Sequence, residues 1–240
     1  MGPALPQPAV PPVPPVMRSV GDSPVTALPE PTFGAPPARL VTRPVHVWRF
    51  VSADRDPLSD TEREHADKFQ SEPARTAFVT GRSGIRRAAA IYTGMAARDL
   101  VVSQTPSGKP FFANAEIHFN LSHSGGEVVA AFSSEPVGLD IESSGRCRDF
   151  AEIARRFFHP EDAALISRED DFLRHWTGKE AILKLVGCGL SGGLERARTT
   201  AAGEGMLDGR RVWIEGFRMG SHRGSVASFQ PFEVKGWFQI

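Results

Sequence analysis

Two carboxylates, Asp140 and Glu142, lie two positions apart in a run that alternates apolar and acidic residues, 137–142. This alternation predicts a half-buried strand, on which positions i and i+2 point to the same face. Leu139 and Ile141 are then expected to enter a core while the two carboxylates project together. Two adjacent negative charges repel each other unless a cation lies between them, and a site with few oxygen ligands suits Mg²⁺. The alternative is an edge strand with a solvated acidic face.

A third carboxylate lies on a predicted helix over residues 170–186. At about 3.6 residues per turn, Glu180 falls on the apolar face beside Trp176, and Lys184 lies one turn further on, at the edge of that face. A buried carboxylate is costly unless it is paired or binds a metal. The alternative is a surface pair between Glu180 and Lys184, worth about 0.2–0.5 kcal/mol. Gly187 is expected to end the helix.

Several short motifs follow one another in a fixed order. They are Gly-Lys-Pro at 108–110, Phe-Asn-Leu-Ser-His-Ser at 119–124, Gly-Leu-Asp-Ile-Glu at 138–142, Arg-Arg-Phe-Phe-His-Pro-Glu at 155–161 and Trp-Thr-Gly-Lys-Glu-Ala-Ile-Leu-Lys at 176–184. In this order and spacing the chain resembles the 4′-phosphopantetheinyl transferases, of the kind that activate carrier proteins of peptide and polyketide synthases.

The resemblance is strong over about residues 105–192, weaker on either side and absent over 1–40. It implies an enzyme of the holo-acyl-carrier-protein synthase type, which moves the phosphopantetheine arm of coenzyme A onto a carrier-protein serine and releases adenosine 3′,5′-bisphosphate. Coenzyme A is then the co-substrate, Mg²⁺ the cofactor, and acyl, peptidyl or aryl carrier proteins are the partners. Two alternatives stay open. One is a degenerate paralogue that binds coenzyme A or a carrier protein without transfer, and the other is a different Mg²⁺-dependent phosphoryl-type hydrolase.

The resemblance also implies roles for the acidic residues. Asp140 and Glu142 resemble metal ligands, and Glu180 resembles either a third ligand or the general base. Lys184 resembles the lysine that meets the pyrophosphate or the leaving phosphate, so it is expected to serve both catalysis and coenzyme A binding. These roles agree with the chemistry, because breaking a pyrophosphate requires charge neutralisation and a base for the attacking hydroxyl.

Coenzyme A contacts are expected, by the same resemblance, from Lys109, Ser122 and His123, with Pro110 fixing the backbone beside Lys109. Serine and histidine can both donate hydrogen bonds to phosphate oxygens. Arg75 lies in an arginine-rich predicted helix whose counterpart in the family meets the 3′-phosphate, and a guanidinium group suits phosphate. A solvated charged face is the alternative for this helix.

Four further polar residues lie in or beside these motifs. Asn120 and Ser124 are expected to cap or turn their loop. The family often has an acidic residue shortly after the paired phenylalanines, and Glu161 and Asp162 both fit that position.

Composition excludes several other classes of protein. The 240 residues carry 28 basic and 28 acidic side chains, and a net charge of zero argues against nonspecific attraction to nucleic acid or membranes. Cys147 and Cys188 cannot form a zinc site or a disulfide framework, which favours a reducing cytoplasm. No apolar run approaches the roughly 20 residues that a transmembrane helix needs. We therefore expect a cytoplasmic monomer with no nucleic-acid or membrane partner.

The prolines mark the first boundary in the chain. Twelve of the twenty fall within residues 1–37, so 1–40 is predicted to be a disordered, proline-rich tail. Residues 41–136 and 137–240 are predicted as an N-terminal and a C-terminal subdomain, each running from a strand through helices to further strands. The resemblance implies an α+β fold, built as a pseudo-twofold pair of similar α/β subdomains with the active site between them.

The expected elements follow from periodicity. Helices are predicted over 58–98 with a break at Pro73, where Gly81 and Gly84 each cost about 1 kcal/mol against alanine, and also over 149–158, 160–167 and 170–186. Strands are predicted over 45–50, 117–121, 127–132, 137–142, 211–218, 226–229 and 233–240.

Overall fold

The computed structural model describes residues 44–145, 149–189, 193–200 and 203–240, so the predicted tail at 1–40 lies outside the described residues. In chain order the elements are β1 (Pro44–Phe50), α1 (Asp60–Asp67), α2 (Glu72–Thr93), a 3₁₀ turn (Ala97–Asp99), β2 (Val102–Gln104), β3 (Pro110–Phe112), β4 (His118–Ser124), β5 (Glu127–Ser133), β6 (Val137–Ser143), α3 (Phe150–Phe157), α4 (Pro160–Ala163), α5 (Glu169–Val186), β7 (Ala197–Thr199), β8 (Glu204–Leu207), β9 (Arg210–Met219), β10 (His222–Ser228) and β11 (Glu233–Gln239). Within the described ranges, no helix has the length and apolar character that crossing a bilayer requires.

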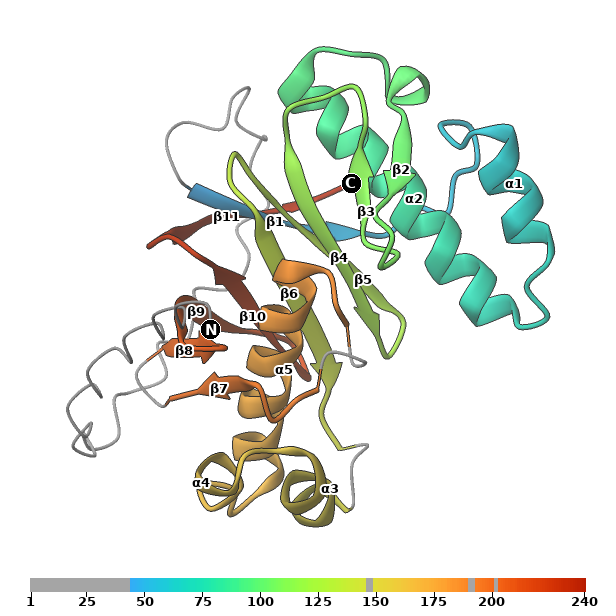
Figure 1. Cartoon of the computed structure of the whole chain (residues 1–240). Helices are drawn as coiled ribbons and strands as arrows, with labels where there is room; N and C mark the ends of the chain where they lie inside the picture. Colours follow the sequence, from blue (N-terminus) through green and yellow to red (C-terminus); the bar gives the residue numbers. More distant parts are fainter. Residues whose placement is uncertain (1–43, 146–148, 190–192, 201–202) are drawn as a thin grey trace, which may run out of the picture.

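The strands form two large sheets and one small ribbon (Figure 1). The first sheet has the order β11-β1-β5-β4, the second has the order β6-β10-β9-β8-β7, and β2 pairs with β3. This mixture of helices and sheets agrees with the predicted α+β class. The orders β1-β5-β4 and β6-β10-β9 match one another, as a repeat requires, while the pseudo-twofold relation itself stays a prediction.

The predicted boundary at residue 136 separates the two sheets except for the last strand. β11 pairs in parallel with β1, with Pro44 opposite Glu233 and Arg49 opposite Gln239. The C-terminal segment of the chain therefore completes the sheet that the N-terminal segment begins.

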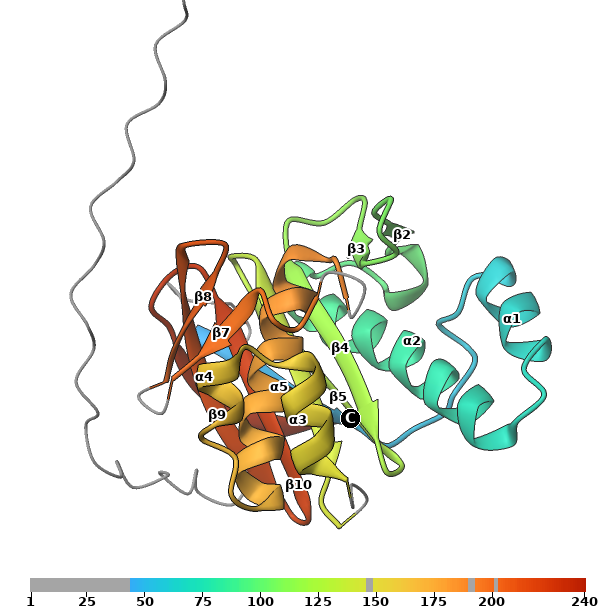
Figure 2. The same ribbon diagram turned by 60° about the horizontal axis from the view of Figure 1, so that its bottom comes forward.

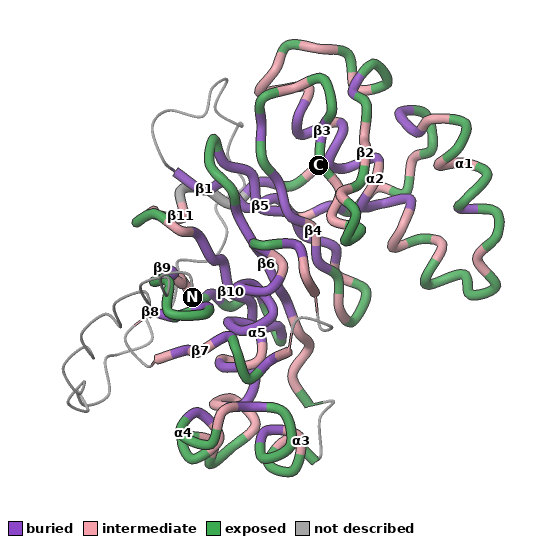
Figure 3. Tube along the Cα trace, viewed as in Figure 1, coloured by how far each residue is buried: buried purple, intermediate pink, exposed green. Residues whose placement is uncertain are grey.

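The first sheet is buried on both faces. Phe50 and Phe132 pack with Ile85 of α2 in one core, whereas Val129 of β5 packs with Leu139 of β6 in a second core between the two sheets. Figure 3 shows buried residues along the strands of both sheets, while α1 and α3 are largely exposed. Alternate side chains of β5 thus pack against α2 on one face of the sheet and against the second sheet on the other face.

The strand β6 is likewise covered on both faces. Leu139 and Ile141 enter the inter-sheet core, as predicted. Asp140 and Glu142 face the other way, and α5 packs on that side of β6 and on β10. The alternative of a solvated acidic edge is wrong, because Asp140 is only 3% exposed. In Figure 2, α3 and α4 lie in front of α5.

Glycine allows the close approach of helix and sheet. A Cβ atom at Gly138 would lie 1.9 Å from the carbonyl oxygen of Ala181, so the backbone of α5 lies directly on β6. A Cβ atom at Gly84 of α2 would lie 2.2 Å from the ring of Phe50. The glycines that weaken an isolated helix are therefore required where α2 meets the first sheet.

The helix ends follow the local sequence. Ser59 and Glu62 form a capping box at the start of α1. The break expected at Pro73 falls between α1 and α2, and Pro73 lies in the first turn of α2, where it needs no hydrogen bond from its nitrogen. Gly187 ends α5 in a left-handed conformation with φ of 78°, as predicted.

We expect Gly138→Ala to lower the free energy of unfolding by about 1–3 kcal/mol or more, because the added methyl group overlaps the α5 backbone. Gly216→Ala on β9 is the matched control, since its added Cβ would meet no heavy atom closer than 3.9 Å. That control should change stability by about 0.5 kcal/mol or less. Urea unfolding midpoints measure both, and equal midpoints would contradict the close approach of α5 to β6.

Candidate active site

Side chains of β4 satisfy the backbone of β6, although the two strands belong to different sheets. Alternate residues of β4 point their oxygen atoms at alternate N–H groups of β6, and both sets of residue numbers rise together. The N–H of Leu139 donates to Asn120 Oδ1 (2.8 Å), that of Ile141 to Ser122 Oγ (3.3 Å) and that of Ser143 to Ser124 Oγ (3.1 Å). These three contacts, which we call the β4–β6 side-chain ladder, fix the register of β6 against β4.

Asp140 is held by this ladder and by α5. Its Oδ1 accepts hydrogen bonds from Ser122 Oγ (2.9 Å) and from the Lys184 ammonium (2.6 Å). Its Oδ2 is buried and has no hydrogen-bond partner among the described residues. Burial raises the pKa of Asp140, and the positive charge of Lys184 opposes that shift. One oxygen is therefore tied to the protein while the other is desolvated and unpaired.

Glu142 is held in a similar way two residues further along β6. Its Oε2 accepts a hydrogen bond from Ser124 Oγ at 2.8 Å. Burial and the charge of Asp140 raise the pKa of Glu142, whereas hydrogen bonds from Ser124 and Trp176 lower it. The pair was predicted to share one face, and the effect of Asp140 on this pKa agrees with that placement.

Glu180 brings a third carboxylate to the same place from α5. It is 6% exposed, and its Oε1 is buried with no hydrogen-bond partner in the described part of the chain. Burial first, and then the charges of Asp140 and Glu142, raise the pKa of Glu180 to about 7, partly opposed by Lys184. The surface-pair alternative is wrong, because Glu180 is buried and the ammonium of Lys184 binds Asp140.

The donor set suits a hard cation. As the side chains stand, no group of three or more His, Cys, Asp or Glu residues in the described ranges is arranged to hold a metal ion, and Lys184 supplies the positive charge beside Asp140. Two unpaired buried carboxylate oxygens, Asp140 Oδ2 and Glu180 Oε1, nevertheless need a partner. Mg²⁺ takes such oxygens as ligands, so the residues fit this ion, and their individual roles as ligands stay a prediction.

A buried ion pair supports α5 beside these acids. Lys179 is fully buried and donates to Asp162 and to the carbonyl oxygen of Ala197. Asp162 also accepts a hydrogen bond from Arg198 Nε at 3.0 Å, and Arg198 binds the exposed Glu161 at 2.6 Å. Of the two acids that sequence left open, Asp162 is therefore the one that anchors the helix.

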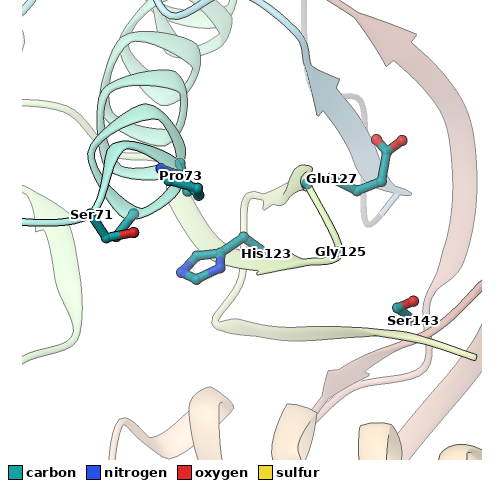
Figure 4. Close-up of a pocket in the computed structure, with 9 residues that line it drawn as sticks. Ser71, Pro73, His123, Gly125, Glu127 and Ser143 are labelled. Atoms are coloured by element: carbon teal, nitrogen blue, oxygen red, sulfur yellow. The ribbon is translucent and has the colours of Figure 1, made fainter. Parts of the chain in front are cut away.

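A cleft of about 680 Å³ reaches Ser143, the residue after Glu142 on β6. It is lined by the start of α2, the β4–β5 turn and the end of β6, namely by Ser71, Pro73, Ala74, Ala77, His123, Gly125, Gly126, Glu127 and Ser143. In Figure 4 the imidazole of His123 projects toward the first turn of α2. Ser143 connects the cleft to the cluster, because its N–H binds the same Ser124 hydroxyl that holds Glu142.

Arg75 lies on α2 next to the cleft-lining Ala74, but its guanidinium group is engaged elsewhere. It donates to the carbonyl oxygens of Ala66 (3.3 Å) and Phe69 (2.9 Å) and to Glu72 (2.6 Å). In the free protein Arg75 therefore joins α2 to the end of α1, and its contact with a 3′-phosphate stays a prediction.

Lys109 is also bound to backbone. Its ammonium donates to the carbonyl oxygens of Val137 (3.1 Å) and Leu185 (2.9 Å), and burial lowers its pKa to about 8. Pro110 begins β3 directly after it. Lys109 thus connects the start of β6 with the end of α5, and the coenzyme A contacts of Lys109 and Pro110 stay predictions.

The structure corrects one expectation and adds residues that sequence reasoning missed. Asn120 and Ser124 do not cap or turn a loop, because both lie on β4 and bind the backbone of β6. The signal was present as alternation of Asn, Ser and Ser at 120, 122 and 124, which places three oxygen atoms on one face of a strand. Gly138 and Asp162 were also missed as residues that position α5.

Comparison with known proteins gives a consistent result. The family model described as the 4′-phosphopantetheinyl transferase superfamily matches residues 136–212, a segment that contains Asp140, Glu142, Glu180 and Lys184. The chain is 30% identical over 185 residues to the 4′-phosphopantetheinyl transferase HetI of Nostoc sp. strain PCC 7120, covering 69% of this chain and 76% of HetI.

Two relatives from Bacillus subtilis are similar over a shorter span. The 4′-phosphopantetheinyl transferase Sfp of strain 168 is 32% identical over 150 residues, covering 60% of this chain and 64% of Sfp. A second 4′-phosphopantetheinyl transferase of this species is 33% identical over 141 residues, covering 56% of this chain and 62% of the relative. The chain thus spans a little less than two thirds of these two relatives.

The pKa of Glu180 predicts a pH-dependent stability in metal-free protein. Because the folded-state pKa is about 7 and the ordinary value is 4.5, the folded state binds the proton more tightly, and the free energy of unfolding falls as pH rises between these values. Glu180→Gln cannot titrate, so its free energy of unfolding should not fall in this way. Between pH 5 and pH 8, the free energy of unfolding of the variant should therefore rise relative to that of the wild type by up to about 3 kcal/mol.

Urea unfolding in EDTA at several pH values measures the difference. Glu64→Gln on the exposed surface of α1 is the control for the loss of one carboxylate at the surface. A constant difference between Glu180→Gln and the wild type across this range would show that Glu180 does not titrate near neutrality.

Proposed function

The chain belongs to the 4′-phosphopantetheinyl transferase superfamily, and from that premise we propose that it transfers the phosphopantetheine arm of coenzyme A to a serine of a carrier protein, releasing adenosine 3′,5′-bisphosphate. The observation that carries this proposal is the meeting of three carboxylates and Lys184 between β6 and α5, within the matched segment. The names of the relatives favour transfer over hydrolysis, and the retained cluster favours activity over a degenerate binding protein.

The acids supply a cation site and a base. Asp140 and Glu142 would hold Mg²⁺, which when bound would neutralise the charge on the pyrophosphate oxygens. Glu180, with a pKa of about 7, is matched to accept the proton of the serine hydroxyl near neutral pH. If Glu180 is a third metal ligand instead, a substitution at this position should lower the transfer rate in a way that depends on the Mg²⁺ concentration. Varying the Mg²⁺ concentration therefore separates the two roles.

Lys184 supplies the positive charge for the phosphates. Its ammonium has three donors, of which Asp140 and Ser122 accept two in the free protein. An ammonium in this position can bind a phosphate oxygen and stabilise the leaving group. Ser122 accepts a hydrogen bond from Lys184 and donates its own proton to Asp140, so a contact between its hydroxyl and a phosphate requires this proton to turn away from Asp140.

The cleft beside the cluster suits the nucleotide part of coenzyme A. The start of α2 lines this cleft, and the positive end of the helix dipole there favours phosphate, although Pro73 has no N–H to donate. His123 faces this turn across the cleft (Figure 4) and can donate a further hydrogen bond. Glu127 lines the same cleft with its charge paired to Arg49 at 2.6 and 2.7 Å, which limits repulsion of an anion.

We also propose the type of transferase, its metal, its carrier proteins, its oligomeric state and its location. They are activity of the holo-acyl-carrier-protein synthase type, a requirement for Mg²⁺, acyl, peptidyl or aryl carrier proteins as partners, a monomeric state and a cytoplasmic location. A panel of apo-carrier proteins of the three kinds tests which of them is modified.

We expect the purified protein to add the mass of one phosphopantetheine group to an apo-carrier protein. The addition should require both coenzyme A and a divalent metal, and intact-protein mass spectrometry measures it. A carrier with its acceptor serine changed to alanine should remain unmodified. Release of adenosine bisphosphate without any carrier would favour the hydrolase, and a folded protein that modifies no carrier of the panel would contradict transfer.

The acidic residues are expected to fail in different ways. Asp140→Ala and Glu142→Ala should each reduce kcat by about 100-fold or more, because charge stabilisation of this kind is worth several kcal/mol. Glu180→Gln should retain coenzyme A binding and lose transfer at every Mg²⁺ concentration if Glu180 is the base, whereas high Mg²⁺ should restore part of the rate if it is a ligand. Glu64→Gln is again the control, and near-normal transfer by Glu180→Gln at ordinary Mg²⁺ would exclude both roles.

His123→Ala should weaken coenzyme A binding with little effect on the unfolding midpoint, because the side chain is exposed in the cleft. A lost hydrogen bond to a charged group is worth about 1.5–3 kcal/mol, which corresponds to roughly a 10- to 100-fold rise in Kd. Calorimetry measures that Kd, and an unchanged value would place the phosphates away from this cleft.

A further inference from the structure

The hydroxyl group of Ser124 makes two hydrogen bonds, and the chemistry of its partners fixes which one it accepts and which one it donates. Its Oγ accepts the N–H of Ser143 at 3.1 Å, and it lies 2.8 Å from Oε2 of Glu142. Because an ionised carboxylate only accepts hydrogen bonds, the serine proton must point at Glu142. Ser124 therefore fixes one oxygen of Glu142 in a single orientation.

From this geometry we propose that Ser124 is a positioning residue, which orients the Glu142 carboxylate so that it can bind the divalent cation. The inference rests on the proposed function, since it concerns the cation that the transfer requires. It assigns to Ser124 a role through Glu142 and not a contact with coenzyme A or with the carrier protein.

The position of Ser124 is itself constrained from the second sheet. Its carbonyl oxygen lies 3.1 Å from Nε2 of His222 on β10. At the next residue, Gly125 has a φ of 58°, and a Cβ there would lie 2.8 Å from the same His222 nitrogen. Ser143, whose N–H binds the hydroxyl, is paired with His222 in the β6–β10 ladder. Ser124 thus joins the β4–β5 turn to the strand that carries Glu142.

The same arrangement occurs one step earlier on both strands, which shows that it is not accidental. Ser122 accepts the N–H of Ile141 and donates to Oδ1 of Asp140. Each carboxylate of the pair therefore has one oxygen bound by a serine of β4. At Asp140 the second oxygen is the buried Oδ2 that lacks a hydrogen-bond partner in the described residues. Ser124 is the counterpart at Glu142, without the additional contact to Lys184 that Ser122 makes.

A free carboxylate samples several rotamers, and an orienting hydrogen bond removes that freedom before the metal arrives. Loss of such a partner behind a ligand typically weakens metal binding by about 10- to 100-fold. Ser124→Ala should therefore raise the Kd for Mn²⁺, measured by calorimetry on the whole protein with coenzyme A present, by about 10-fold. The Mg²⁺ concentration for half-maximal transfer should rise similarly, while kcat at saturating Mg²⁺ and the KM for the carrier protein change less than about 3-fold.

Two further variants separate positioning from folding. Ser133→Ala on β5 is the matched control, because Ser133 Oγ also accepts a backbone N–H, that of Glu135 at 3.2 Å; it should leave Mn²⁺ binding unchanged. Ser124→Thr keeps the hydroxyl group and should bind Mn²⁺ within about 3-fold of the wild type. Should Ser124→Ala fail to fold, Ser124→Cys, which keeps the volume but donates weakly, replaces it with the same expected rise in Kd.

The outcomes are distinguishable. If the wild type binds Mn²⁺ and transfers phosphopantetheine but Ser124→Ala has the same Mn²⁺ affinity and Mg²⁺ dependence, the positioning role is wrong and the proposed function stands. Equal losses of Mn²⁺ affinity in Ser124→Ala and Ser133→Ala would also overturn it, since both would then report a lost backbone contact. If the wild type neither binds Mn²⁺ nor modifies any carrier protein, the proposed function itself fails.

Discussion

The site depends on three side-chain oxygens that act as a substitute for a β-ladder. Asn120, Ser122 and Ser124 reach from the edge of one sheet to the backbone of β6, the edge of the other. A backbone ladder between β4 and β6 would have joined the two sheets into one, and it would have left no hydroxyl proton to donate to the carboxylates. Hydroxyl groups accept from the backbone and still have a proton to give, so they connect the halves of the molecule and orient the acids in the same contacts. The same contacts therefore determine both the register of β4 against β6 and the orientation of the Asp140 and Glu142 carboxylates.

The arrangement is expensive for the folded protein in the absence of a cation. Asp140 and Glu180 are buried and Glu142 is half-buried, and burial raises the pKa values of all three carboxyl groups. Backbone approach at Gly138 brings the third acid close, and the buried Lys179–Asp162 pair keeps the helix in place on its other side. A cation bound among these carboxylates would relieve the unfavourable charge of the free protein, as is common where electrostatics are arranged in advance for chemistry.

Much of this could be predicted from sequence, and the failures have physical reasons. The alternation at 137–142 correctly placed Leu139 and Asp140 on opposite faces of the strand, and the apolar arc of the later helix correctly buried Glu180. The prediction that the strand is half-buried was wrong, because α5 covers the acidic face and leaves Asp140 only 3% exposed. Short strands such as β7 and β8 went unpredicted, because three or four residues carry too little periodicity. Residue type did not predict that Lys109 and Arg75 bind backbone carbonyl oxygens in the free protein, because those contacts depend on segments that are distant or irregular in the sequence. Their contacts with phosphate stay predictions.

The pairing of β11 with β1 sets a condition on how the chain folds. Contacts such as that between Arg49 and Gln239 close a loop of 190 positions, so their entropic cost is met late and their formation is slow. On the ribosome, β1 would keep an open edge until the final strand emerges, and an open, hydrophobic edge is a template for misassembly. The two halves therefore share one sheet, although each has its own helix and core. The seven residues of β11 complete the sheet that supports β4, and through β4 they support Asp140 and Glu142 on β6.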